Sequence, residues 1–254
     1  NMFGSSSTIS ENSGKWYAEF YLGAFSSSAV FMPGITGDPA EDNRSNNYLG
    51  AAATAWGYDA STGVLYNNGG AVYTTSTATT GDIIGVAMDL ENSKLYFSIN
   101  NTWQNSGVPT SGATGTGAAS LTAGETYAFG VSDGSASHST TTIVNYGQDS
   151  SFAGNKTAQG NADENDIGDF YYTPPAGYLA LCTSNFDDPS IKKSSTNYNT
   201  VLYTGTGASN AITGVGFQPD FVWIKSRSHA QWHQVQDAVR GATKSLYPNE
   251  DNDE

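Results

Sequence analysis

Cysteine is almost absent from this chain. Cys182 is the only cysteine in 254 residues, so no disulfide can form within the chain and no zinc site can be built from several cysteines. Long apolar runs are also missing: the longest, such as residues 83–88, fall far short of the ~20 residues that a membrane-spanning helix needs. Residues 1–5 contain neither a basic nor an apolar segment and do not resemble a signal peptide. The sequence therefore predicts no insertion into a membrane.

Positive charge is scarce as well. Ten Lys and Arg stand against 24 Asp and Glu, which gives a formal net charge of −14. Such a chain repels phosphate backbones and anionic lipids, so nucleic acid and membrane surfaces are unsuitable partners. Charged residues make up only 13% of the chain, whereas its 29 glycines, about 11%, exceed the typical ~7%. This composition is typical of a turn-rich, all-β protein.

Segments with β-strand composition recur about every ten residues, separated by clusters of Gly, Asn, Asp and Ser. The first strong strand, 15–22, alternates so that Trp16 and Phe20 share one face while Glu19 lies on the other. Two hairpin-like pairs follow, 56–58 with 64–66 and 83–90 with 95–99. Further strands are expected at 126–131, 141–146 and 178–182. The pattern predicts an antiparallel β-sandwich or barrel.

The chain becomes polar over residues 183–199, which we interpret as a linker. Hydrophobic strands resume at Val201, and residues 200–254 resemble the start of a second β domain. About 55 residues bury only a marginal core, so we expect this module to continue beyond the fragment or to be completed by another chain. The chain begins on Asn1, and we expect it to be part of a longer protein.

The ordered motifs of the first part resemble a SPRY domain. They are Ser-Gly-Lys-Trp-Tyr-Ala-Glu at 13–19, Trp-Gly-Tyr-Asp at 56–59, Gly-Asp-Ile-Ile-Gly-Val-Ala-Met-Asp-Leu at 81–90 and Leu-Tyr-Phe-Ser-Ile-Asn-Asn at 95–101. Residues 127–131, 144–148 and 174–178 resemble the closing strands of the family. The resemblance covers residues 13–182, apart from inserted stretches at 106–124 and 159–169. It implies a SPRY-like (concanavalin-like) antiparallel β-sandwich that binds protein segments through loops at one edge, without catalysis and without a cofactor.

The second part resembles a module that follows SPRY-like domains in tailed-bacteriophage virion proteins. The matching residues are 201–207, 212–225 and 237–241. The resemblance implies a non-enzymatic virion protein, in a tail fibre or another surface appendage of the phage particle. Its partners would be other virion subunits, in a homo-oligomer, and a host surface protein or glycan. A carbohydrate-directed protein, a lectin or a glycanase, remains the alternative, because concanavalin-like sandwiches host both.

Few residues offer catalytic or metal-binding chemistry. Glu19 and Asp89 are the carboxylates of the predicted central strands, and they could form a glycosidase pair. A structural role is favoured, because no third carboxylate lines a glycanase cleft. His229 and His233 would chelate a metal only on a helix; their polar surroundings favour ordinary surface histidines. We find no nucleophile elbow, phosphate-binding loop or dinucleotide fingerprint. The sequence predicts neither an enzyme nor a resident metal.

An acidic loop at residues 163–169 raises the question of calcium, because this cation prefers oxygen ligands. Counted from Asp163, the fifth position of the loop is Ile167 and the twelfth is Pro174. The bidentate Glu of the EF-hand loop is therefore missing. A solvated loop is favoured, and calcium binding stays open.

Four aromatic residues near turns, Trp56, Tyr58, Tyr66 and Tyr73, are candidates for a binding surface. Aromatic rings at loops stack on sugars or anchor protein ligands. Core packing is the competing interpretation, above all for Trp56. We expect replacement of Tyr58 or Tyr66 by Ala to weaken partner binding by about 1–2 kcal/mol and to leave melting nearly unchanged.

Overall fold

The computed structural model of the chain describes residues 3–24, 31–39, 48–133, 140–186, 191, 193–241 and 243–251. It divides into two compact units, Asn1–Phe186 and Asp187–Glu254. The boundary lies within the stretch predicted as a linker, and each unit is described by itself below. None of the described helices is long and apolar enough to cross a membrane.

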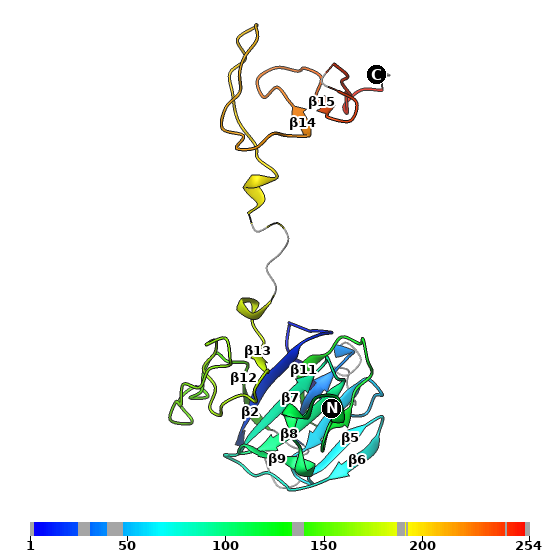
Figure 1. The fold of residues 1–254 in the computed structure, drawn as a ribbon, viewed down its shortest axis with the longest axis vertical. Coiled ribbons are helices and arrows are strands. Elements are labelled where there is room, and N and C mark those ends of the chain that lie inside the picture. The colour runs from blue at the N-terminus through cyan, green and yellow to red at the C-terminus, as the bar shows by residue number, and fades with distance from the viewer. Residues whose placement is uncertain are drawn as a thin grey trace. The chain divides into compact units, whose positions relative to one another are not determined.

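Two β-sheets form the first unit (Figure 1). The six-stranded sheet has the order β1-β11-β3-β4-β5-β6. Its strands are β1 (Phe3–Ser6), β3 (Phe31–Thr36), β4 (Ala55–Asp59), β5 (Val64–Asn67), β6 (Gly70–Thr74) and β11 (Ala128–Asp133). Every pairing in this sheet is antiparallel.

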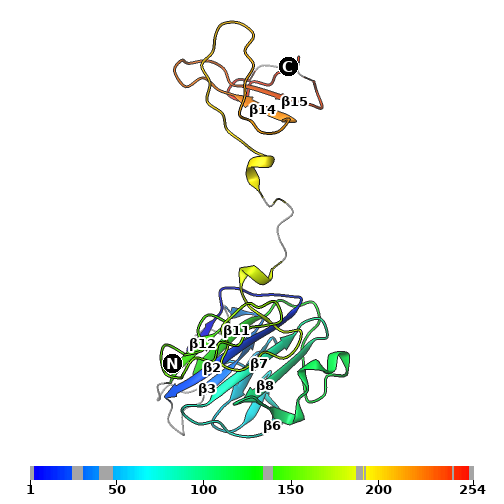
Figure 2. The ribbon, with the colours of Figure 1, turned by 60° about the vertical axis from the view of Figure 1, so that its left-hand side comes forward.

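The seven-stranded sheet has the order β10-β8-β7-β2-β12, and β9 and β13 pair off this path with β8 and β2. Its strands are β2 (Lys15–Ala24), β7 (Ile83–Asp89), β8 (Lys94–Ile99), β9 (Thr102–Trp103), β10 (Ala119–Ser120), β12 (Thr141–Asn145) and β13 (Leu179–Ala180). Short 3-10 helices are η1 (Gln104–Ser106), η2 (Pro109–Thr114), η3 (Thr183–Asn185) and η4 (Ser194–Thr196). The two sheets face each other (Figure 2), which confirms the predicted β-sandwich.

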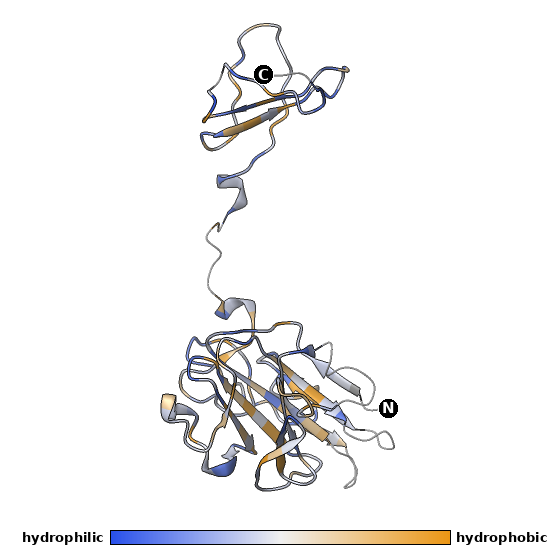
Figure 3. Ribbon diagram, turned by 90° about the vertical axis from the view of Figure 1, so that its right-hand side faces the viewer, coloured by the Kyte–Doolittle hydropathy of each residue, from blue (hydrophilic) through white to orange (hydrophobic). Residues whose placement is uncertain are grey.

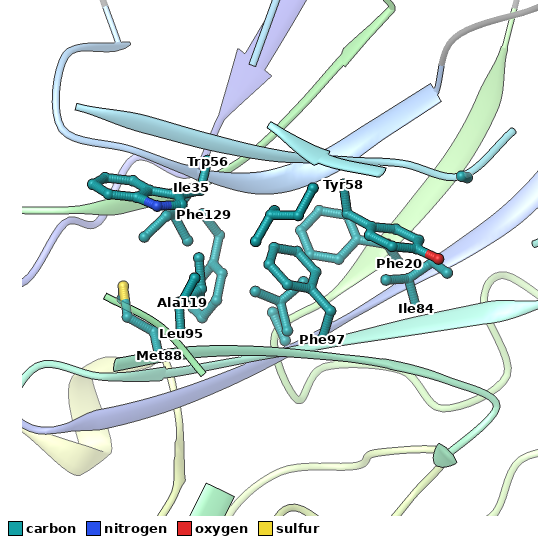
Figure 4. Packing of buried hydrophobic residues seen from close by; sticks show 14 of the residues in the cluster. Phe20, Ile35, Trp56, Tyr58, Ile84, Met88, Leu95, Phe97, Ala119 and Phe129 are labelled. Carbon is teal, nitrogen blue, oxygen red and sulfur yellow. The ribbon is translucent and has the colours of Figure 1, made fainter. Parts of the chain in front are cut away.

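The main core fills the space between the two sheets. The alternation predicted for residues 15–22 is confirmed, because Trp16, Phe20 and Leu22 belong to this core. From β7 and β8 it receives Ile84, Met88 and Phe97, which face Ile35 and Phe129 of the other sheet (Figure 4). Hydrophobic positions recur along the strands of both sheets (Figure 3).

The opposite face of β2 is buried too. Tyr17 is 1% exposed and packs in a second cluster with Phe170 and Tyr178, and Tyr21 stacks on Phe152. These partners come from residues 146–182, so this long segment covers the outer face of the seven-stranded sheet. The strand alternation alone indicates only one buried face, since it does not reveal a covering segment.

Strand β3 was missed by the sequence pattern, although it lies inside the six-stranded sheet between β11 and β4. Proline has no N–H for a ladder hydrogen bond and is normally confined to edges or bulges. Because Pro33 lies in this segment, the sequence pattern did not indicate a strand there. Gly34, in register with Gly57, allows the close approach of β4, because a Cβ there would overlap the carbonyl oxygen of Trp56.

Among the described residues of the second unit there is one two-stranded sheet, β14 (Phe221–Ile224) with β15 (Gln234–Asp237). A bridge between Val235 and Leu246 adds one rung beyond β15. Val235 is the only buried hydrophobic residue in the part of this unit that the structure describes. Large apolar side chains remain exposed instead: Tyr198, Leu202, Tyr203, Ile212, Phe221, Trp223, Trp232 and Val239.

Candidate functional site

Trp56 and Tyr58 lie in the core between the sheets and do not form a binding surface. Their exposed fractions are 3% and 0%. Trp56 packs edge-on against Tyr127, and Tyr58 stacks on Phe97 with 5.6 Å between ring centroids. The Tyr58 hydroxyl donates a hydrogen bond to the carbonyl oxygen of Ser76. Because inner-face positions of β4 point at β8, the expectation that Tyr58 contacts a partner is wrong.

Tyr66 and Tyr73 are each half-buried. Tyr73 packs against the main core, and its hydroxyl has no hydrogen-bond partner; burial raises its pKa. Tyr66 lies on the outer face, where it meets Tyr48 edge-on at 6.3 Å. Tyr66 also packs against the buried cluster of Met32, Leu49 and Ala55. A contact between Tyr66 and a partner stays a prediction.

Tyr66 belongs to one of two charge-free segments of the first unit, residues 60–81 and 95–124, whose exposed side chains we call the uncharged surface. The half-buried Lys94 borders this surface, because its side chain lies against Gly115 of the inserted loop. No residue in 60–81 or in 95–124 is charged, in a chain that is 13% charged. The two segments meet where the Ser76 N–H donates to Gln104 Oε1 at 3.3 Å. Val72 and Val108, 45% and 43% exposed, are the large exposed hydrophobics among the described residues of this unit, and both lie in these segments.

This uncharged surface was not recognised from the sequence. Interface centres are depleted of charged residues and enriched in apolar ones, so two long charge-free segments in an acidic chain are a usable signal. Which of their residues are exposed could not be predicted. A bulge between β5 and β6, where Leu65 pairs with Tyr73 but Tyr66 pairs with Ala71, leaves Val72 exposed at the outer strand.

Glu19 is a fully buried carboxylate on the outer face of β2. It accepts hydrogen bonds from the N–H groups of Tyr171 and Tyr172 at 2.9 and 2.8 Å, and further bonds from Asn145 Nδ2 at 3.1 Å and Tyr17 Oη at 3.3 Å. Burial raises the pKa of Glu19 more than these four bonds lower it, to about 7. The carboxylate anchors the 146–182 segment to the sheet, which is the structural role that the sequence favoured.

Asp89 lies too far from Glu19 to form a glycosidase pair with it. Asp89 is in register with Lys15, four residues along β2 from Glu19, so the two are separated by about 13 Å at 3.3 Å per residue. Glycosidase carboxylates lie about 5–9.5 Å apart. Asp89 instead accepts hydrogen bonds from the N–H and Nδ2 of Asn92, at 3.0 and 2.8 Å.

Residues 130–134 read Gly-Val-Ser-Asp-Gly, which matches the letters of a hydrolase nucleophile elbow. An elbow places its serine on an exposed turn between a strand and a helix. Ser132 lies within β11, is 2% exposed, and accepts a hydrogen bond from the Leu49 N–H at 2.8 Å. The expectation that the sequence contains no such motif is therefore wrong in its letters, but Ser132 is a buried strand residue and not an exposed nucleophile.

The carboxylate of Asp163 is surrounded by N–H donors from its own chain. The N–H groups of Asn165, Ile167 and Ala180 donate to it at 2.9, 3.0 and 2.9 Å, and Asn185 Nδ2 donates at 2.8 Å. Burial raises the pKa of Asp163, but these bonds outweigh it and hold the pKa below its usual value. In the described part of the chain no three His, Cys, Asp or Glu side chains gather as a metal site.

We therefore expect calcium to leave the stability of the first unit unchanged. A cation at Asp163 would have to displace the donors that already occupy both oxygens of the carboxylate. The measurement is the melting temperature in excess CaCl2 and in EDTA, with MgCl2 as a control for ionic strength. A rise in melting temperature specific to calcium would contradict this interpretation.

The two histidines of the second unit do not share a helical face. Residues 226–234 contain no helix, which agrees with the favoured interpretation of surface histidines. His229 Nδ1 lies 3.0 Å from Ser228 Oγ, and the His233 ring packs on Trp223. His138 lies outside the described residues.

Comparison with known proteins agrees with the geometry of the first unit. Residues 15–129 match the family model of the SPRY domain, and residues 193–254 match one described as a domain of unknown function, DUF7483. Among solved structures, the SPRY domain of human HERC1 is similar, with 20% identity and a TM-score of 0.45 over 56% of this chain and 80% of that one. No curated protein matches the chain. The sandwich is SPRY-like, as the sequence predicted.

Proposed function

We propose that this chain is a binding protein of a phage particle, in a tail fibre or another surface appendage, and that its SPRY-like sandwich contacts a host surface receptor or a neighbouring virion subunit. The observation that carries the proposal is the uncharged surface of a SPRY-like sandwich, a fold that generally serves protein interaction. The assignment to a phage rests on the resemblance of residues 201–241 to a module of virion proteins.

The uncharged surface suits a protein partner better than a charged ligand. Removing charged groups from water is costly, whereas burying exposed valines and the edge of a tyrosine ring gains about 25 cal/mol per Å² of apolar area. Val72 and Val108 therefore supply contact area without a desolvation penalty. Ionic recognition of an anionic polymer has no support from these segments, which contain no Lys or Arg.

Lysine substitution on this surface tests the proposal. We expect Val72→Lys to weaken binding to the partner about tenfold or more, because the interface would have to bury an unpaired charge. Binding of the purified chain is measured on intact host cells and on particles that lack it. Stability should change by less than about 0.5 kcal/mol, because Val72 is 45% exposed at a sheet edge.

Ala158→Lys is the matched control for Val72→Lys. Ala158 is exposed on the segment that covers the other sheet, and the substitution adds the same charge outside the proposed contact surface. It should bind as the wild type does. If both variants bind normally, or if both bind equally weakly, the contact surface lies elsewhere.

A further inference from the structure

The outer edge of β14 is unpaired in the second unit. Among the described residues β14 pairs only with β15. The N–H of Ala238 donates to the carbonyl of Asp220 at 2.8 Å. Because hydrogen-bonded and non-hydrogen-bonded pairs alternate along an antiparallel ladder, the even-numbered residues of β14 bond to β15. The N–H and C=O groups of Phe221 and Trp223 therefore point outward.

The outer edge of β15, unlike that of β14, has a hydrogen-bond partner. Val235 exchanges two hydrogen bonds of 2.9 Å with Leu246, so the middle of β15 has a partner on both sides. Natural proteins cover or charge an open edge, because it is a template for another strand. Here the open edge presents two aromatic side chains, Phe221 and Trp223, each 59% exposed.

We propose that β14 pairs with β14 of a second copy of this chain, antiparallel and centred on Val222, so that the sheets of two copies join into one. Phe221 of each copy then lies opposite Trp223 of the other. Both pairs exchange N–H and C=O groups, giving four backbone hydrogen bonds across the new interface. The inference does not depend on the proposed phage function.

The edge is complementary to itself in this register. The symmetric pairing places two Phe–Trp pairs side by side on one face, and aromatic cross-strand pairs stabilise sheets. Centring on Trp223 would oppose Phe221 to Lys225, and centring on Phe221 would oppose Trp223 to Pro219, which has no N–H. A twofold interface uses the same patch on both copies, so the best partner for this edge is another copy of it.

Disulfide trapping tests the register. In the proposed dimer Val222 faces Val222 of the second copy as a non-hydrogen-bonded pair, with about 4.5 Å between Cα atoms, which a disulfide can bridge. We expect Val222→Cys, in a Cys182→Ser background, to form a covalent dimer under mild oxidation. Ile224→Cys is the control, because the two Ile224 positions are four residues out of register. Equal trapping of both variants, or none of Val222→Cys, would overturn the proposal.

Sedimentation of the full chain tests the interface without an introduced cysteine. The wild type should show a concentration-dependent dimer. Phe221→Lys should weaken the dimer at least tenfold, because a charge replaces an aromatic ring in the new sheet. Val239→Lys adds the same charge at a residue that is 97% exposed and outside β14, and it should dimerise as the wild type does. A wild type that stays monomeric at all concentrations, or an unimpaired Phe221→Lys, would contradict the inference.

Discussion

Replacing Tyr58 by Ala should lower the free energy of unfolding of the first unit by about 3–5 kcal/mol, the range for deletion of a large aromatic ring from a core. The side chain is 0% exposed, and its ring stacks on Phe97. Its removal leaves a cavity between the two sheets and leaves the carbonyl of Ser76 without this donor. The measurement is chemical denaturation monitored by tryptophan fluorescence.

Tyr58→Phe is the control that separates the ring from the hydroxyl. It retains the stacking on Phe97 and loses only the hydrogen bond to Ser76, so the expected loss is about 1 kcal/mol. If Tyr58→Ala melts like the wild type and loses only partner binding, Tyr58 is not a core residue in solution and the original sequence interpretation is restored.

The second large effect is expected from Glu19→Ala. Two backbone N–H groups, those of Tyr171 and Tyr172, would lose their acceptor in a buried site. Leaving such donors unpaired costs about 1–3 kcal/mol each, so we expect a loss of about 3–5 kcal/mol. Hydrogen exchange should accelerate at the amides of Tyr171 and Tyr172 before the sandwich unfolds. Unchanged exchange at these amides would show that the 146–182 segment is held by its aromatic contacts alone.

Glu19 also predicts a pH dependence of stability. Its pKa in the folded state is about 7, raised from 4.5, so the folded state binds this proton more tightly than the unfolded state does. The stability contributed by that proton is fully present below about pH 4.5 and is lost as the pH rises through about 7, in total roughly 3 kcal/mol.

Glu19→Gln isolates this effect, because the amide does not titrate. The difference in unfolding free energy between the wild type and Glu19→Gln should shift by about 2.5 kcal/mol against the wild type between pH 5 and pH 8. A difference that stays constant over this range would mean that the carboxylate is ionised throughout, its four donors outweighing its burial.

The sequence predicted the sandwich because its strands keep a strict alternation where one face meets the core. In residues 15–22 the spacing of Trp16 and Phe20 was enough to identify the face that packs in the main core, although the other face is buried as well. The strand β3 could not be predicted in the same way, since Pro33 interrupts the pattern that defines a strand. Its place in the sheet depends on contacts with β11 and β4, which are distant in sequence.

The candidate site was predicted less well than the fold. Tyr58 and Tyr66 flank the same turn, yet their environments differ because they point to opposite faces of the sheet. Glu19 was correctly assigned a structural role, but its partners, the amides of Tyr171 and Tyr172, lie about 150 residues away in sequence. Local patterns do not identify such contacts.

The central claim is that the chain binds a partner on or beside a phage particle and does not process a glycan. The most direct measurement incubates the purified chain with host cells and records, in one assay, the amount bound, the competition with phage adsorption and the reducing ends released from surface polysaccharide. A chain that contacts a host receptor should bind saturably and compete with phage. A chain that contacts a virion subunit should bind instead to particles lacking it. In both cases the account predicts no release of reducing ends. Release of reducing ends, or binding to neither cells nor particles, would contradict it.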